Sequence, residues 1–212
     1  MDLNEGVVMI VSCRTSIEEQ RQTLPGDSMI QEPSASWTHG VTITSPIAKV
    51  WQWIAQMGAD RAGWYSYDFI DNGGRPSATE ILSQFQKVVV GMVFPAIPDA
   101  SDAFIVASVE PAHSLVLTVP EKGAIPIVTW SFLLVPIENS NTRLLVRARM
   151  SGGWRDLARN SKSGGRILFI NRIYRLLARL PESLMIFIGG IGHGIMQRRM
   201  LKGIKRRAES WA

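Results

Sequence analysis

The chain has 212 residues, of which 46% are hydrophobic and 19% are charged, so it can bury a sizeable core and is not disordered by composition. Its single cysteine excludes an internal disulfide and a cysteine-rich metal site, so we expect a reducing, cytoplasmic location. The net charge of +5 conceals an asymmetry: residues 1–142 hold 15 acidic and 7 basic side chains, whereas residues 143–212 hold 3 and 16. Such a basic part suits nucleic acid or anionic lipid, but we favour a solvated face that offsets the acidic part.

Residues 1–36 are expected to form an N-terminal extension ahead of one domain over residues 37–212. Within the extension, Leu24-Pro25-Gly26-Asp27 has the composition of a turn. The apolar run at residues 6–11 is short and follows acidic residues, which does not fit a secretory signal.

Residues 37–44 alternate between apolar and polar side chains, which predicts a strand. Ser45 as N-cap and Pro46 as first helical residue then predict a helix that Gly58 ends. Its expected buried stripe has helical spacing and consists of Ile47, Val50, Trp51, Ile54 and Met57.

The stretch Gly63-Trp64-Tyr65-Ser66-Tyr67-Asp68 follows this helix in a segment that we expect to be irregular. Trp and Tyr combine an apolar body with a polar tip, which suits the wall of a ligand pocket. The alternative is a core cluster that ties the helix to a sheet, with Asp68 capping a turn. Further along, Ser77 is predicted to cap a short helix that includes Phe85.

From residue 88 onward the pattern predicts consecutive strands with short turns, and hence an antiparallel sheet in an α+β fold. Trp130 and Phe132 share the inward face of one strand, where they line a cavity or pack in the core. Arg147 and Arg149 are expected on the outward face, and an inward Arg147 that binds an anion is the alternative. The predicted strands are 88–94, 102–110, 114–119, 126–137 and 142–150.

Residues 151–181 form a basic insert, in which residues 166–180 predict a basic amphipathic helix. Such a helix makes an anionic membrane surface a candidate partner. A long C-terminal helix is predicted over residues 182–208, and its apolar run is shorter than the roughly 20 residues that a membrane span needs. The basic run at residues 202–207 fits the solvated end of this helix, so we expect no nucleic-acid partner.

His39, His113 and His193 do not have the spacing of metal ligands, and no phosphate loop or nucleophile elbow occurs, so we expect no metal and no cofactor. His193 falls where the last helix is expected to face the sheet. It is therefore a candidate for ligand contact or acid–base chemistry, with simple packing as the alternative.

Three motifs resemble bacterial members of the SRPBCC superfamily, the START-like, helix-grip group that includes lipid-transfer domains, plant allergens and polyketide cyclases. They are the Leu24–Asp27 turn, the Ser-Pro helix followed by Asp60-Arg61-Ala62-Gly63-Trp64-Tyr65-Ser66-Tyr67-Asp68, and the ending Met196–Glu209. The resemblance covers roughly residues 20–150 and 190–209, and it points to a subgroup without an assigned function.

The resemblance implies a seven-stranded antiparallel sheet wrapped around a long C-terminal helix, with an apolar cavity between them. The basic insert departs from that pattern. So does the run Gly189-Gly190-Ile191-Gly192-His193-Gly194, because glycine inside a helix costs about 1 kcal/mol relative to alanine. This run indicates a break, a close helix contact, or room for a ligand beside the backbone.

The leading hypothesis is therefore a protein that binds a small hydrophobic molecule of lipid, polyketide-like or terpenoid-like type in an internal cavity. One alternative is a cyclase or aromatase in which Tyr67, Asp68 or His193 moves protons. A second is a peripheral membrane protein. The sequence leaves the oligomeric state open. The expected ligand-binding residues are Trp64, Tyr65, Tyr67, Trp130, Phe132, His193 and Met196.

Overall fold

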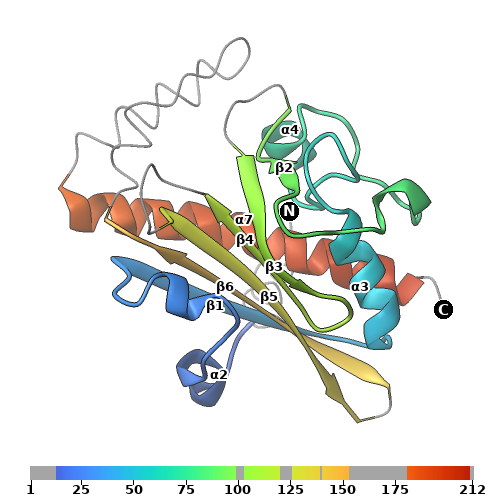
Figure 1. The fold of residues 1–212 in the computed structure, drawn as a ribbon, viewed down its shortest axis with the longest axis horizontal. Helices are drawn as coiled ribbons and strands as arrows, with labels where there is room; N and C mark the ends of the chain where they lie inside the picture. Colours follow the sequence, from blue (N-terminus) through green and yellow to red (C-terminus); the bar gives the residue numbers. More distant parts are fainter. Residues whose placement is uncertain (1–12, 99–102, 120–125, 139, 153–180, 211–212) are drawn as a thin grey trace, which may run out of the picture.

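The computed structural model describes residues 13–98, 103–119, 126–138, 140–152 and 181–210. These residues form an antiparallel sheet, short helices before and after its first strand, among them α4, Asp68–Asp71, and a long C-terminal helix α7, Glu182–Ser210 (Figure 1). Residues 1–12, the predicted basic helix at 166–180 and nearly all of the expected insert lie outside the described residues. The predicted α+β class and the long last helix are confirmed.

The sheet has six strands in the order β1-β6-β5-β4-β3-β2, and each neighbouring pair is antiparallel. The first and last strands lie side by side, from Ala35 opposite Met150 to Ile43 opposite Thr142. This pairing leaves β1 at one edge of the sheet. The strands are β1 Ala35–Ile43, β2 Val93–Pro95, β3 Ala103–Glu110, β4 Ser114–Val119, β5 Val128–Ile137 and β6 Asn141–Met150.

The count of seven strands that the resemblance implied is wrong for the described part of the chain, which contains six. The predicted strand at 88–94 is also too long, because β2 begins only at Val93. Gly91 has a φ of +86°, and the Met92 N–H donates to the Val89 carbonyl, so a turn occupies this part of the chain. The turn explains why the alternation of apolar residues overestimates the strand.

Helix α3, Ile47–Gln56, confirms the predicted helix, although its N-cap is Pro46 rather than Ser45 and its C-cap is Met57 rather than Gly58. The predicted buried stripe is wrong at Trp51, which is only partly buried, whereas Trp53 is buried. The helix predicted to start at Ser77 is wrong, since only a 3-10 turn, η2, Ser83–Phe85, forms there. The Ser77 side chain is used elsewhere: its hydroxyl donates to Asp68 and accepts from the Tyr65 N–H. It therefore does not cap a helix.

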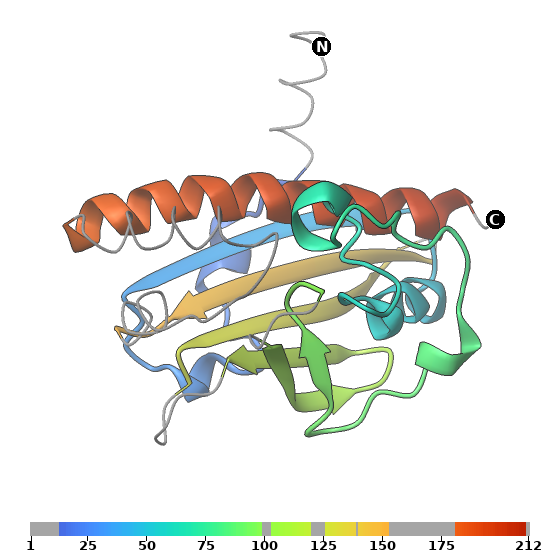
Figure 2. The same cartoon turned by 90° about the horizontal axis from the view of Figure 1, so that it is seen from above.

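The two faces of the sheet are covered by different parts of the chain. Helix α7 lies over the inner face and runs along β1, as Figure 2 shows. The inner side chains of β6 join the core with the second half of α7, and Leu145 faces Leu24 on the outer side. The outer face thus carries the N-terminal segment, which includes α2, Ile17–Arg21, and η1, Asp27–Met29.

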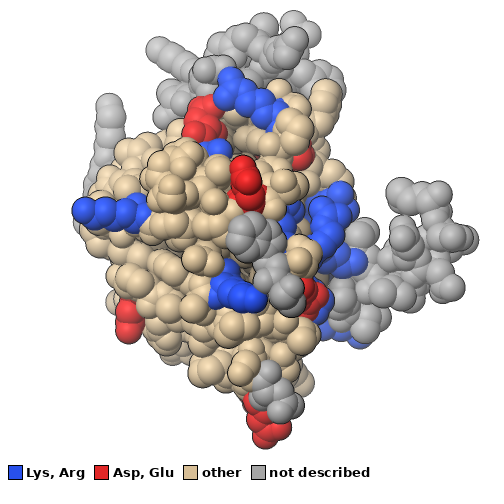
Figure 3. All heavy atoms as spheres, turned by 90° about the vertical axis from the view of Figure 1, so that its right-hand side faces the viewer, with Lys and Arg blue, Asp and Glu red and all other residues tan. Residues whose placement is uncertain are grey.

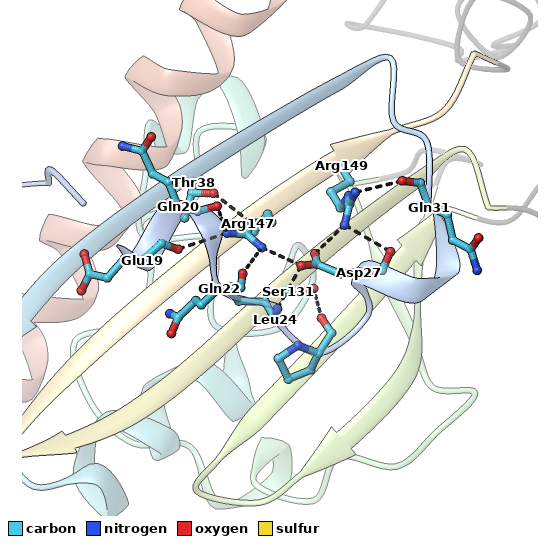
Figure 4. Close-up of polar contacts among 11 residues, drawn as sticks. Glu19, Gln20, Gln22, Leu24, Asp27, Gln31, Thr38, Ser131, Arg147 and Arg149 are labelled. Atoms are coloured by element: carbon cyan, nitrogen blue, oxygen red, sulfur yellow. Dashed lines mark hydrogen bonds and ion pairs between the residues drawn. The ribbon is translucent and has the colours of Figure 1, made fainter. Parts of the chain in front are cut away.

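An ionic network fastens this N-terminal segment to the sheet (Figure 4). Arg147 and Arg149 of β6 point outward, as predicted, and both contact the carboxylate of Asp27. Nearby, Arg143 forms an ion pair with Glu19 at 2.7 Å. These pairs join the acidic and basic parts of the chain, so several of the C-terminal basic residues are neutralised internally.

The charge asymmetry of the sequence does not appear on the end of the molecule that Figure 3 shows. Figure 3 views the end of the molecule where α7 finishes, and basic and acidic side chains are interspersed there on a mostly uncharged face. In α7 itself, Lys205 bonds Glu209 and the Thr42 carbonyl. None of the described helices combines the length and the apolar character that crossing a membrane requires.

Candidate functional site

An open groove lies between the edge strand β1 and the first half of α7, with a volume of about 530 Å³. Glycine allows the helix to approach the strand closely here: a Cβ on Gly190 would lie 2.8 Å from Nε1 of Trp37. The glycine run of α7 therefore makes a close helix contact, and it contains no break. The groove is lined by Trp37, His39, Ser183, Ile186, Phe187, Gly190, Ile191, Gly194, Ile195 and Arg198.

Three polar side chains meet where β1 passes under α7, namely His39, His193 and Gln197, which we call the polar trio. The rings of His39 and His193 have centroids 6.1 Å apart, and Trp37 lies 5.4 Å from His193. Gln197 follows His193 by four residues and so lies on the same side of the helix. Burial lowers the pKa of both His39 and His193 to about 4, with Arg198 adding to the effect at His39, so both rings are neutral at pH 7.

An aromatic cluster continues from the polar trio along the inner face of the sheet. Trp130 of β5 donates its indole N–H to Oε1 of Gln197 at 2.9 Å. Its ring lies 5.3 Å from the rings of both Trp64 and Phe104 and 5.0 Å from that of Phe132. Trp64 is anchored by a hydrogen bond to the Ala96 carbonyl, 2.9 Å long. The cluster and the trio are thus connected between the sheet and α7 through the Trp130–Gln197 bond. None of the ligand-binding residues expected from the sequence lines the groove.

The segment before Trp64 is held by Arg61, whose role the sequence did not indicate. Its guanidinium donates to the carbonyls of Ala55, Met57 and Phe85, and it stacks 4.4 Å above the centre of the Phe94 ring. Burial lowers the pKa of Arg61, but these acceptors and the ring face stabilise its charge. Arg61 therefore fixes the path of the chain into the aromatic stretch.

Tyr65 is buried, and its hydroxyl donates to the Trp53 carbonyl at 3.0 Å. Its backbone has a φ of +58°, and α7 crosses it so closely that a Cβ on Gly203 would lie 2.2 Å from its carbonyl oxygen. The guanidinium of Arg207 covers the ring at 4.6 Å. These contacts tie α3 and α7 together through Tyr65.

Both oxygens of Asp68 accept hydrogen bonds from Ser77, one from its backbone N–H at 3.0 Å and one from its hydroxyl. Tyr67 is half-buried, with the Arg199 guanidinium 5.7 Å from its ring. No hydrogen bond, ion pair or ring contact among the described residues joins His193 to either of these two side chains. The three catalytic candidates are thus not assembled into one constellation.

The substitution Asp68→Asn replaces one of the two carboxylate oxygens by an NH2 group, which cannot accept the hydrogen bond that Ser77 donates there. We expect it to lower the free energy of unfolding by about 2 kcal/mol. Urea denaturation measures the change, and Asp60→Asn, at an exposed carboxylate in the same motif, is the matched control with an effect below about 1 kcal/mol. Unchanged stability together with lost ligand binding would favour a pocket role for Asp68 instead.

The other predicted site residues lie as follows. Met196 is half-buried on α7, where its carbonyl accepts from the Ser66 hydroxyl at 3.1 Å. Trp37, His39 and Gln197 were not predicted as site residues from the sequence. The period of two along β1 places Trp37 on the same face as His39, and the spacing of four along α7 places Gln197 beside His193, so both were detectable once the two elements were known to touch.

The described residues contain no group of three or more His, Cys, Asp or Glu side chains that could hold a metal ion. Cys13 is buried and lies 3.9 Å from the Arg198 carbonyl oxygen. Asp71 is also buried, and its burial, with the nearby Asp68 charge, raises its pKa to about 6. None of these groups lines the groove.

No family model matches the chain, and no curated protein matches it in sequence. Among solved structures, it is similar to the Zhui aromatase/cyclase from Streptomyces sp. R1128, with a TM-score of 0.44 and 14% identity over 82% of this chain and 93% of that one. It is also similar to the polyketide-cyclase-like protein Cgl2372 from Corynebacterium glutamicum, with a TM-score of 0.39 and 18% identity over 81% and 89% of the two chains. A protein from Arthrobacter aurescens gives a TM-score of 0.44 and 12% identity over 95% and 92%. Similarities of this size carry no conclusion about ligand or reaction.

Proposed function

We propose that the protein binds a small, largely apolar molecule in the groove between β1 and the first half of α7. The observation that carries the proposal is the groove itself, because its volume of about 530 Å³ falls within the range of small-molecule sites and most of its lining is apolar. Phe187 and Ile191 on its helix wall are 65% and 51% exposed. Large apolar side chains gathered beside a concavity and left in water are typical of a binding surface.

Binding fits the chemistry of the groove better than acid–base catalysis does. A general base works best when its pKa is near the working pH, and that of His193 lies at about 4. The carboxylate of Asp68 is engaged by Ser77, as described above. We therefore propose a binding protein, with the cyclase reading as the alternative that needs a base at the ligand.

The test uses the hydrophobic dye 1-anilinonaphthalene-8-sulfonate and two glycine positions of α7. Gly194 lines the groove, whereas a Cβ on Gly192 would meet nothing within 4 Å. We expect Gly194→Leu to fill the groove and to raise the Kd of the dye at least tenfold, and Gly192→Leu to leave it unchanged within twofold. Both substitutions remove one helical glycine, so their effects on helix propensity cancel in the comparison.

Fluorescence titration gives both dissociation constants. Equal dye affinities in the two variants, or no saturable binding by the unmodified protein, would contradict a ligand site in the groove. Dye binding that depends on added anionic vesicles would instead favour the membrane-surface hypothesis.

A further inference from the structure

Each member of the polar trio has a buried nitrogen without a hydrogen-bond partner: Nδ1 of His39, Nε2 of His193 and Nε2 of Gln197. The His39 residue is only 9% exposed, and Gln197 only 2%. Buried polar atoms in folded proteins are nearly always paired, and an unpaired one is costly. Three such atoms in one place therefore require an explanation.

His39 and His193 meet at the β1–α7 junction, and Gln197 lies one turn further along α7 on the same side of the helix as His193. The two imidazole rings approach edge to face, with an interplanar angle of 62°. Gly194 follows His193 on the helix, and a Cβ built there would lie 3.7 Å from Nε2 of His39. Of the trio, only His39 lines the groove, together with Gly194, the helix neighbour of His193. His193 and Gln197 are not among the lining residues.

We propose that the polar trio is the polar subsite of the groove and binds a neutral oxygen, a carbonyl or hydroxyl, of the otherwise apolar ligand. The inference rests on the proposed function and makes it more specific, because it selects apolar molecules that carry such an oxygen over hydrocarbons and over carboxylates.

The hydrogen-bonding chemistry of the trio matches a neutral oxygen. The indole N–H of Trp130 donates to Oε1 of Gln197, and this bond leaves the amide nitrogen, a donor, as the free end. A neutral imidazole offers one N–H donor and one acceptor nitrogen, and both rings are neutral at pH 7. The trio can therefore donate hydrogen bonds to a carbonyl oxygen. It can also accept a hydrogen bond from a hydroxyl, and it carries no net charge.

The ligand reaches the subsite when the first half of α7 moves away from β1. The second half is fixed by the core residues Met200, Leu201 and Ile204, which are 1% exposed or less. The first half carries Gly189, Gly190, Gly192 and Gly194 and has few buried side chains. Because glycine weakens a helix, a small displacement of this half is the cheapest way to expose the three nitrogens.

The experiment measures affinities for two probes of nearly equal shape, 2-acetylnaphthalene, which carries a carbonyl, and 2-isopropylnaphthalene, which does not. The quantity of interest is the ratio of the two dissociation constants by equilibrium dialysis, compared between proteins, since the difference in probe hydrophobicity then cancels. We expect the advantage of the ketone to fall about tenfold in Gln197→Met and in His193→Leu. His113→Leu, at an exposed turn residue, is the matched control and leaves the ratio unchanged within twofold.

A second measurement uses the unmodified protein and so does not depend on how well the variants fold. In nitrogen-15 NMR spectra, 2-acetylnaphthalene is expected to shift the ring nitrogens of His39 and His193 and to leave those of His113 in place.

The outcomes separate the subsite from the groove. If both probes bind and their ratio is the same in all variants, or if only the His113 nitrogens shift, the polar subsite is overturned and the groove stands. Stronger binding of 2-naphthoate than of the ketone would make Arg198 the anchor and would also overturn it. If neither probe binds saturably, the subsite and the proposed function fail together.

Discussion

Replacing Arg147 by alanine is expected to lower the free energy of unfolding by about 3–5 kcal/mol, the size of effect seen when one partner of a buried ion pair is removed. Arg147 is 4% exposed. Its guanidinium donates to Asp27 at 2.6 Å, to Thr38 at 2.8 Å and to three carbonyls of the N-terminal segment. The substitution leaves these carbonyls without the Arg147 donor, and it leaves Oδ2 of Asp27 with the Leu24 N–H but without its cationic partner. The carbonyls are those of Glu19, Gln20 and Gln22.

The matched control is Arg75→Ala, which breaks the ion pair between Arg75 and Asp60 at the surface. Solvent screens that pair, so we expect a loss below about 1 kcal/mol. Urea denaturation of both variants gives the two values, and hydrogen exchange would show whether the N-terminal segment detaches first. If Arg147→Ala and Arg75→Ala lowered the free energy of unfolding by amounts that agree within about 1 kcal/mol, the buried network would not hold this segment to the sheet.

Acidification from pH 7 to pH 4 is expected to destabilise the protein through the buried histidines. Burial lowers the pKa of His39 to about 4 in the folded state, against about 6.5 when unfolded, so the unfolded chain binds the proton more tightly. The contribution of His39 is complete above pH 6.5 and is lost as the pH falls toward 4, by about 3 kcal/mol. His193 acts in the same direction.

Asp71 opposes this trend. Its pKa is raised to about 6, so its protonation stabilises the fold as the pH falls from about 6 toward its ordinary value of 3.8. Two histidines outweigh one carboxyl, and the net effect remains a loss. Urea denaturation at pH 7 and pH 4.5 measures how much the free energy of unfolding falls between the two pH values. We expect a smaller fall in His39→Leu, and a larger fall in Asp71→Asn, than in the unmodified protein. His113→Leu is the control. An unchanged pH dependence in His39→Leu would contradict the assignment.

The aromatic stretch shows how far a local motif can be interpreted. The sequence singled out Trp64 to Asp68 and left pocket wall and core cluster as alternatives. In the structure, Tyr65 and Asp68 make contacts that fix the chain, through the Trp53 carbonyl and through Ser77. Trp64 belongs to the aromatic cluster, because its ring contacts that of Trp130. Trp64 is only 3% exposed and does not line the groove, so the contacts of the motif are those of a core cluster, and a pocket role for Trp64 stays a prediction.

The fold and the site differ in how much the sequence predicted. Periodicity placed α3, most of the strands and α7, and it assigned the outward faces of Arg147 and Arg149, since these depend on spacing along one element. It failed at residues 77–94, where side chain–backbone bonds and a turn at Gly91 override the pattern. It also gave no sign of Arg61, whose contacts lie in three separate segments.

The sequence by itself determined the elements, the inward faces of the strands and a last helix with an unusual glycine run. Only the tertiary structure decided which side chains these elements bring into contact. Asp27 reaches Arg147 across 120 residues because the N-terminal segment packs on the outer face of the sheet. His39 reaches His193 because β1 is an edge strand that lies along α7. Local spacing fixes the face on which a side chain lies, but the partner on that face depends on strand order and helix position, which no local pattern encodes.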